Sequence, residues 1–369
     1  MAAVSGRSGS VQMPVRVIGM IGVAPPTGAA LHVIGGGVSA SFLGEFAQMH
    51  EKAGFDLVLV GYYSSSAEGF AVAAYAASQT TTLGYLVAHR PGLVAPTLAA
   101  RTIATFDALW GGRLAVHIIA GNSDEDMERD GDFTPKDQRY ERAGEYLDVM
   151  RRVWTCTEPF DYDGRFYKLR KVFPDVRPIQ KPYPELLFGG SSSGALVMGA
   201  QHCDTFAMFG EPRAETAERM TEFRELAARF GRPAPKFNMS FRPIIGRTEG
   251  EAWDRANKIL AELKVAPPHP RGQDLSGKRL VDIAARGDVH DECLWMPVAA
   301  LSGGKGNTSC LVGTAEQVAD ALLRYYRMGI TSFLMRGFEP LNDASEYGRE
   351  LIPRLKAGAL MIDQEALAA

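Results

Sequence analysis

Cysteine is scarce in this chain: there are four cysteines in 369 residues, and they stand far apart. No two have the CxxC spacing of a redox or zinc motif, and no Cys/His cluster has the spacing of metal ligands. The sequence therefore predicts neither a disulfide framework nor a metal site. This cysteine usage fits a reducing compartment such as the cytoplasm.

Long apolar runs and a strong charge of one sign are also lacking. No apolar run approaches the roughly 20 residues that span a membrane. The formal net charge of −3 gives no reason to expect nucleic acid or a membrane surface as a partner. Residues 1–13 are small and polar, without the apolar core of a signal peptide. We expect a disordered tail there, followed by a single domain over residues 14–360.

What the sequence does contain is a regular alternation of two patterns. Short apolar runs typical of strands lie at 16–22, 56–61, 83–89, 114–120, 186–190, 205–210, 238–245 and 331–337. Helical periodicity occurs at 41–53, 69–79, 96–109, 139–154, 194–201, 214–230, 249–263 and 315–328. Strands that alternate with helices indicate βαβ units and a parallel sheet. Eight such units predict an α/β fold, the (β/α)8 TIM barrel.

The chain is longer than the about 250 residues that a bare barrel needs, and the excess collects in two segments. The segment 156–184 carries Asp163-Gly164, a turn signal for a β-hairpin. The segment 265–313 is rich in Gly, Pro, Lys and Arg. Loops of this length inside a compact domain are usually functional, and we expect 265–313 to be a mobile lid.

A run of glycine and serine follows the fifth predicted strand, and it is the most informative local feature. Gly190, Ser191 and Ser192 stand between this strand and a helical segment. Glycine lets the backbone approach a ligand, serine caps the helix, and the helix N-terminus favours an anion such as phosphate. An ordinary capped turn remains the alternative on this motif alone.

The other predicted strand ends are rich in Ser, Asn, Gly and Arg. Barrel enzymes place their sites at the C-terminal ends of the strands. These ends hold no carboxylate pair, metal-ligand cluster or Ser/His/Asp order, so acid–base and metal hydrolysis are poorly supported. Such a rim favours a bound cofactor that carries the reactive chemistry. His117, inside the fourth strand, is expected to be a packing residue.

Several short motifs occur in a fixed order along the chain. They are Arg90-Pro91-Gly92, 96–101, 111–114, Ala120-Gly121-Asn122, 139–142, 181–184, 188–192, Gly210-Glu211-Pro212 and 311–314. Together they resemble the bacterial-luciferase-like flavin-dependent monooxygenases, and most closely the alkanesulfonate monooxygenase group. The resemblance covers roughly residues 14–355, and its agreement with an eight-unit barrel makes it specific at the family level.

The resemblance implies a barrel that binds reduced FMN, supplied by a separate NAD(P)H-dependent flavin reductase, and that uses O2. An alkanesulfonate or sulfosugar would be desulfonated to an aldehyde and sulfite. The residues that would bind FMN by position are His89, Arg90, Gly121, Asn122, Tyr140, Gly190, Ser191 and Ser192. Open alternatives are helix packing for Tyr140, a rim salt bridge for Arg90 and a turn for Asn122.

The substrate side departs from the resembled pattern. Arg242 lies in Ser240-Phe241-Arg242, where the resembled enzymes carry Arg-x-His, and their Tyr and His after the eighth strand are lost. Ser66 stands in place of a Cys after the second strand, and Phe209 in place of a Trp. Arg242, Arg336 and Ser66 are therefore the expected catalytic positions.

Other cationic residues lie near the positions where the substrate-side residues of the resembled enzymes are missing. We expect Phe209, Arg242, Lys305 and Arg336 to contact the substrate, with the guanidinium groups holding an anionic head group. The alternatives are a structural pairing of Arg336 with Glu339 or Asp343, and a solvated loop charge for Lys305.

The expected function is thus oxygenation of a small anionic organosulfur compound. Other open functions are oxygenation of a sulfone or alkane, deazaflavin-dependent hydride transfer on the same fold, and non-catalytic flavin binding. The resemblance also implies a homo-oligomer, either a dimer or a tetramer.

Overall fold

Eight parallel strands form a closed barrel. The computed structural model describes residues 15–25, 35–120, 123–265, 275–304 and 306–368. Around the barrel the strands are β1 (Arg16–Met20), β2 (Leu57–Val60), β3 (Gly84–His89), β4 (Leu114–Ile118), β7 (Leu186–Phe188), β8 (Thr205–Phe209), β9 (Lys236–Gly246) and β13 (Ile330–Met335). The ring closes because β9 pairs with both β8 and β13, and β13 pairs with β1. Every strand overlaps a predicted one, so the predicted barrel is confirmed.

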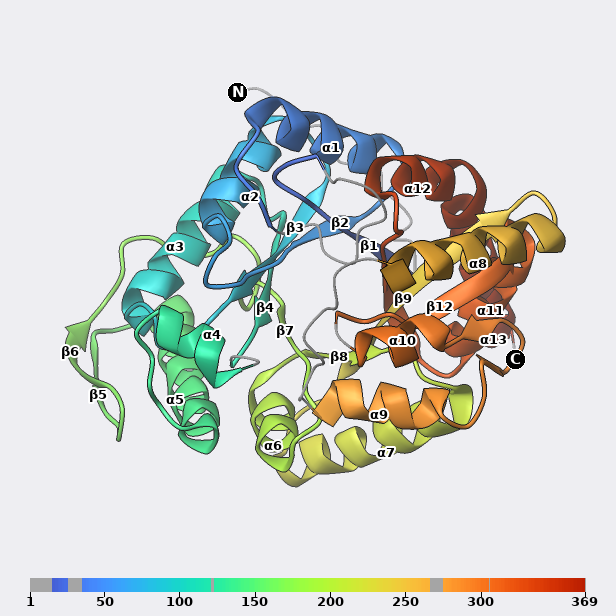
Figure 1. Cartoon of the computed structure of the whole chain (residues 1–369). Coiled ribbons are helices and arrows are strands. Elements are labelled where there is room, and N and C mark those ends of the chain that lie inside the picture. The colour runs from blue at the N-terminus through green and yellow to red at the C-terminus, as the bar shows by residue number, and fades with distance from the viewer. Residues whose placement is uncertain (1–14, 26–34, 121–122, 266–274, 305, 369) are drawn as a thin grey trace.

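Helices surround the barrel on its outside (Figure 1). Those that match the predicted helical segments are α1 (Ala40–Lys52), α2 (Gly69–Ser78), α3 (Pro96–Leu109), α5 (Lys136–Thr155), α6 (Ser193–His202), α7 (Arg213–Arg229), α8 (Glu249–Val265) and α11 (Ala315–Arg327). Short polar caps fix where some of them begin. Thr314 and Gln317, for example, form a reciprocal capping box at the start of α11.

The strands are apolar on both faces, as expected for a parallel sheet covered by helices. Alternate residues separate two layers of the core. One layer fills the barrel interior and consists of Ile18, Leu57, Leu86, Ala115, Leu187 and Leu334. The other layer, which includes Val58, Val60, Tyr85 and Val87, packs against the surrounding helices. The interior is therefore a packed core at its base, and ligand space can exist only at the C-terminal ends of the strands.

Strand β9 does not stay in the barrel over its full length. Residues Phe237 to Phe241 pair with β13, whereas Arg242 to Gly246 pair with β12 (Cys310–Thr314), a further parallel strand outside the ring. Arg242 is the first residue of β9 on the β12 side. The sequence reading did not predict β12, because its short apolar run leads directly into α11 without a separating loop.

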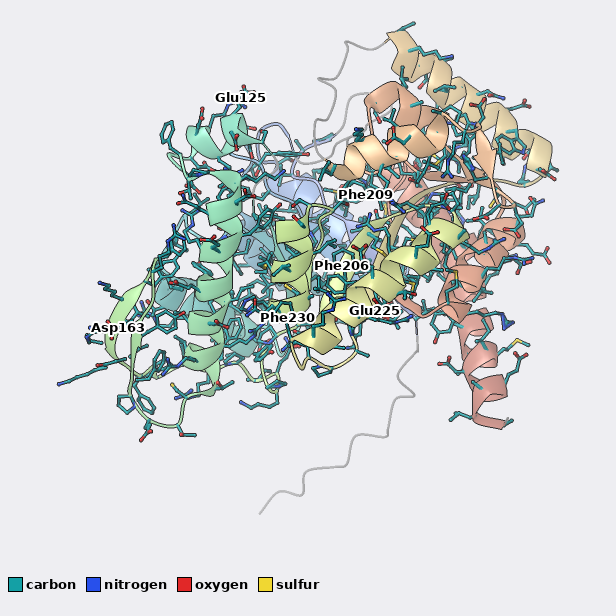
Figure 2. All side chains as sticks on the ribbon, turned by 90° about the horizontal axis from the view of Figure 1, so that it is seen from below. Glu125, Asp163, Phe206, Phe209, Glu225 and Phe230 are labelled. Carbon is teal, nitrogen blue, oxygen red and sulfur yellow. The ribbon has the colours of Figure 1, made fainter. Side chains whose placement is uncertain are left out.

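The two long segments predicted outside the bare barrel lie in different places. The first contains the hairpin of β5 (Phe160–Asp163) and β6 (Lys168–Val172), which confirms the turn at Asp163-Gly164. This hairpin lies at the edge of the molecule, and Figure 2 shows Asp163 far from Phe209 in the centre.

The second segment is partly helical. It contains α9 (Leu275–Ala284), β10 (Val289–His290), β11 (Leu294–Trp295) and α10 (Pro297–Ser302) before β12. The predicted tail at 1–13 and Lys305 lie outside the described residues. Three more helices are α4 (Asp124–Arg129), α12 (Pro340–Glu346) and α13 (Ile352–Ala368), with a π-helical turn at Tyr347–Leu351. Over the described ranges, no helix is both long and apolar enough to cross a membrane.

Candidate active site

A cavity of about 330 Å³ opens at the C-terminal ends of the barrel strands. All eight strands or the residues directly after them contribute to its wall. Representative lining residues, in the order of the strands, are Met20, Gly61, Arg90, His117, Gly189, Phe209, Ser240 and Arg336. The segment 265–313 adds Leu275, Ser276, Gly306 and Asn307. The cavity therefore lies where TIM-barrel enzymes carry their active sites.

The glycine and serine run forms one end of the cavity. Gly189, Gly190, Ser191 and Ser192 all line it. The Ser192 hydroxyl caps α6 by accepting a hydrogen bond from the Ala195 backbone N–H at 3.3 Å. At Gly189 a Cβ atom would come within 2.6 Å of the Ala207 carbonyl oxygen, so a side chain there cannot be accommodated. The turn combines close backbone approach with a helix N-terminus, the two features of an anion site.

Tyr140 on α5 brings a third hydroxyl to this end of the cavity. The Ser192 hydroxyl donates to the Tyr140 hydroxyl at 3.4 Å, and the Tyr140 ring meets Phe188 edge-on. The structure thus brings together Tyr140 and Ser192, which are 52 positions apart. The Tyr140 ring packs against β7, as the packing alternative expected, and the side chain also lines the cavity.

Helix α9 packs onto the same end of the cavity. The hydroxyls of Ser276 and Ser191 lie 2.8 Å apart. Arg279 on α9 donates from Nε to both carboxylate oxygens of Glu211 at 2.8 Å. Arg219 on α7 donates to Glu211 at 3.2 Å and to the Gly190 carbonyl oxygen at 3.3 Å. The buried Glu211 therefore holds α9 and the glycine-rich turn together through two arginines.

Arg90 lines the cavity and is paired with two carboxylates. Its guanidinium donates to Asp126 at 2.5 Å and to Asp130 at 2.9 Å, and it lies 4.5 Å from the centre of the Tyr62 ring. Burial opposes ionisation of Asp126, but hydrogen bonds from Ser64 and Arg90 outweigh it and lower the pKa of this carboxyl. Of the two expected roles of Arg90, the rim salt bridge is formed, and α4 is tied to the strand ends through it.

Arg336, directly after β13, projects a second guanidinium into the cavity. Its Nη1 lies 3.1 Å from the Met20 sulfur and its Nη2 donates to the Asn307 carbonyl oxygen at 3.4 Å. Its Nε is buried, with no hydrogen-bond partner over the described ranges. Within the described part of the chain, no carboxylate forms an ion pair with Arg336, so the expected pairing with Glu339 or Asp343 does not occur. Those two acids instead pair with Arg255 on α8.

Arg242 lies beside Arg336 but not on the cavity wall. Its side chain is 1% exposed, and it donates to the carbonyl oxygens of Asn307 at 3.0 Å and Gly337 at 3.1 Å. Its guanidinium also lies 4.7 Å from the centre of the Phe338 ring. Burial, together with the charge of Arg242, lowers the pKa of Arg336 well below its usual range. Burial and the neighbouring Arg242 charge both disfavour the charged form of Arg336. A bound anion in the cavity next to Arg336 would therefore be favourable.

Besides Arg242, two expected site residues do not line the cavity, and the structure corrects their positions. His89 follows Ala88 on β3, so it faces outward, where its Nε2 lies 2.8 Å from the Tyr146 hydroxyl. Ser66 closes a turn by donating to the Tyr63 carbonyl oxygen at 2.8 Å. Gly121, Asn122 and Lys305 lie outside the described residues. Phe209 does line the cavity, at the end of β8.

His117 and Asn307 are among the cavity residues that the sequence reading missed. His117 was expected to pack, but it lines the cavity, and its Nδ1 is buried without a hydrogen-bond partner among the described residues. Burial lowers the pKa of His117 to about 4, so the imidazole is neutral at pH 7. Ala115 faces the barrel interior, and residues two apart on a strand face the same side, so His117 should face the interior as well. This alternation was the signal that could have identified His117. Asn307 had no comparable signal, because its position depends on how the segment 265–313 folds back onto β9.

Comparisons with known proteins agree with this architecture. The model of the luciferase-like monooxygenase family matches residues 20–332. EDTA monooxygenase (EmoA) from Chelativorans sp. BNC1 is 18% identical, with 93% of this chain and 94% of that chain covered and a TM-score of 0.74. Riboflavin lyase (RcaE), solved with modified FMN and riboflavin, is 18% identical over 93% and 92% of the two chains, with a TM-score of 0.73.

A deazaflavin enzyme has a similar fold as well. An F420-dependent secondary alcohol dehydrogenase, in complex with an F420–acetone adduct, is 19% identical over 93% of this chain and 99% of that chain, with a TM-score of 0.66. At these identities the likeness concerns the fold alone. The family match, in contrast, spans most of the chain and contains the barrel strands from β2 to β9 in full. The chain belongs to the luciferase-like monooxygenase family.

Proposed function

We propose that the cavity binds reduced FMN with its phosphate at the glycine and serine turn. The observation that carries this proposal is the convergence of Tyr140, Ser191 and Ser192 on a helix N-terminus, beside a glycine at which no side chain fits. Hydroxyl and backbone N–H donors are the groups that bind a phosphate. Bound there, reduced FMN would supply the two electrons that activate O2.

The remaining tasks in this proposal belong to the chain itself. Gly190 lets the backbone approach the phosphate closely, and the buried Glu211 with its two arginines fixes this turn against α7 and α9. Arg90, held by two carboxylates, lines the cavity at the end of β3. Gly121 and Asn122 complete the flavin side in this proposal, and the segment 265–313 covers the cavity and excludes water.

We further propose that the substrate is a small organic anion, with an organosulfonate as the leading candidate. Arg336 supports this, because it offers a partly buried guanidinium to the cavity, and no carboxylate among the described residues pairs with it. Guanidinium groups bind the oxygens of a sulfonate through paired donors. Phe209 offers an apolar surface for the carbon part of the substrate. Arg242 supports Arg336 indirectly in this proposal, because it fixes the Asn307 carbonyl that Arg336 also contacts.

The overall reaction proposed is desulfonation, which places the protein near the alkanesulfonate group of its family. One oxygen atom of O2 goes to the carbon that carries the sulfonate, and the other leaves as water. The carbon–sulfur bond breaks, and an aldehyde and bisulfite are released. Reduced FMN provides two electrons and is regenerated by a separate NAD(P)H-dependent flavin reductase. In this proposal the protein is cytoplasmic and acts as a homo-oligomer.

The test is sulfite release with FMN, NADH, a flavin reductase and air, over a panel of alkanesulfonates and a sulfosugar. Sulfite above a control without the enzyme, with matching O2 consumption, would support desulfonation. O2 consumption and a new oxygenated product without sulfite would move the substrate to sulfones or alkanes. Oxidation of reduced F420 with an alcohol or ketone couple, independent of O2, would overturn the monooxygenase proposal in favour of hydride transfer.

A further inference from the structure

Helix α9 contributes a hydroxyl to the end of the cavity where the phosphate is proposed to bind. Ser276 lines the cavity in the first turn of α9, and its hydroxyl lies 2.8 Å from the Ser191 hydroxyl. In Figure 1, α9 lies next to α6 and α7, at the edge of the barrel near β8. The N-termini of α6 and α9 therefore meet at one place, although they are far apart in the chain.

The four hydroxyls at this place form two pairs. Ser192 is paired with Tyr140, and Ser191 with Ser276. A hydroxyl carries one proton and rotates freely, so in a pair only one of the two protons is used between the partners. An anion between the pairs could accept from the remaining hydroxyls, and each would gain a charge-assisted hydrogen bond. A phosphate has enough acceptor oxygens for one such hydrogen bond from each pair.

Ionic contacts hold α9 in the position that brings Ser276 to the turn. Arg279 is one helical turn after Ser276 and forms a two-oxygen contact with Glu211. Glu211 in turn holds Arg219, which donates to the Gly190 carbonyl. The chain from Arg279 to Gly190 fixes α9 to the same turn that Ser276 contacts. The two arginines and one carboxylate also leave a net positive charge beside it.

We propose that Ser276 is a ligand of the cofactor's phosphate, so that α9 closes the phosphate site and makes the protein select a phosphorylated flavin over riboflavin. This inference rests on the proposed function, which assigns the phosphate to the turn formed by Gly190, Ser191 and Ser192. It adds a residue of the segment 265–313 to the flavin site. It also gives this segment a role at the cofactor and not only at the substrate.

The experiment compares the dissociation constants of FMN and riboflavin, oxidised and anaerobically reduced, by titration of the full-length protein. The variants are Ser276→Ala, Ser276→Thr and, as a matched control, Ser78→Ala. The control removes an exposed serine hydroxyl on α2 that contacts only its own helix and the neighbouring Gln79. A hydrogen bond to a charged group corresponds to roughly a tenfold or larger change in affinity.

The expected result is that Ser276→Ala weakens FMN binding roughly tenfold, leaves riboflavin binding unchanged, and is rescued by Ser276→Thr. The inference is overturned if Ser276→Ala leaves FMN binding unchanged, or if it weakens FMN and riboflavin equally, as a merely structural role would. If the wild-type protein itself binds FMN no better than riboflavin, the proposed phosphate site fails, and this inference fails with it. The wild-type ratio therefore separates the two failures.

Discussion

Arg242 and Arg336 share one acceptor, the carbonyl oxygen of Asn307, at 3.0 Å and 3.4 Å. They come from neighbouring strand ends, yet only Arg336 reaches the cavity. Two like charges in this arrangement disfavour each other, and a third group of opposite charge would relieve the repulsion. This relationship is the reason for expecting an anionic substrate.

Replacing Arg336 should separate substrate binding from cofactor binding. Arg336→Met should raise the KM for the substrate or the inhibition constant of a sulfonate analogue at least tenfold, because a charge-assisted contact is lost. Arg336→Lys should restore only part of the substrate affinity, since the lysine ammonium lacks the paired, planar donors of the guanidinium. FMN affinity should not change. An unchanged KM in Arg336→Met would remove the argument for an anionic substrate.

Replacing His117, the histidine in the cavity wall, should raise stability but weaken ligand binding. His117 carries a buried Nδ1 that has no hydrogen-bond partner in the part of the chain that the structure describes, and an unsatisfied buried polar atom costs on the order of 1–3 kcal/mol. His117→Leu should therefore increase the free energy of unfolding, by about 1 kcal/mol, while it weakens flavin or substrate binding. Denaturant unfolding and flavin titration measure the two effects. A variant that is less stable and binds normally would show that His117 only packs.

Glu211 should be essential for the docking of α9. Its carboxylate is buried between Arg219 and Arg279, and a change to Ala would leave two partly buried cations without a partner. Such a loss typically costs about 3–5 kcal/mol, less here because Arg279 is partly exposed to solvent. Glu211→Ala should also reduce protection of α9 in hydrogen exchange. Glu215→Ala, which removes a more exposed pair with Arg286, is the control and should have a small effect.

The glycine-rich turn should not tolerate a methyl group. Gly189→Ala would place its Cβ 2.6 Å from the Ala207 carbonyl oxygen, so β7 or β8 must shift. We expect a loss of stability and of FMN affinity together. Gly287→Ala is a suitable control, because its nearest atom would be 3.9 Å away. FMN titration and thermal unfolding of both variants give the comparison, and equal behaviour of the two would contradict this account of the turn.

Stability should fall in mild acid because of buried histidines, two of which, His50 and His89, do not line the cavity. Burial lowers the pKa of His50 and of His89 to about 4, whereas the unfolded chain has a pKa near 6.5. The unfolded state therefore takes up protons first as the pH falls, so the stabilisation is complete above pH 6.5 and is lost between pH 6.5 and 4. Each histidine accounts for at most about 3 kcal/mol. Urea unfolding from pH 7 to pH 4.5 measures the loss.

A single substitution checks the histidine account. His50→Phe keeps an aromatic ring between Phe46 and Phe55 but removes the titrating group. Its free energy of unfolding should therefore fall less steeply with decreasing pH than that of the wild-type protein. The same slope in both proteins would assign the acid sensitivity to other groups.

The orientation of side chains on the strands was the hardest part to predict. His89 and Arg242 were chosen for their position in the chain, but the alternation of β3 turns His89 outward, and the change of partner along β9 takes Arg242 off the wall. Local composition does not show whether a strand residue faces inward or outward, or which strand it pairs with. The glycine and serine turn was easier to predict, because Gly190, Ser191 and Ser192 are consecutive and their turn is a local structure.

The sequence by itself determined the eight strands, the helices between them, and the turn that joins β7 to α6. These features depend on the alternation of apolar residues, on caps and on glycine, which act over a few neighbouring residues. Only the tertiary structure decided that Ser276 meets Ser191 across 85 positions, that Asn307 meets the two arginines, and that Arg336 has no carboxylate partner within the described residues. Those contacts follow from the packing of distant segments, in which burial and charge pairing select among many arrangements that the local sequence allows equally.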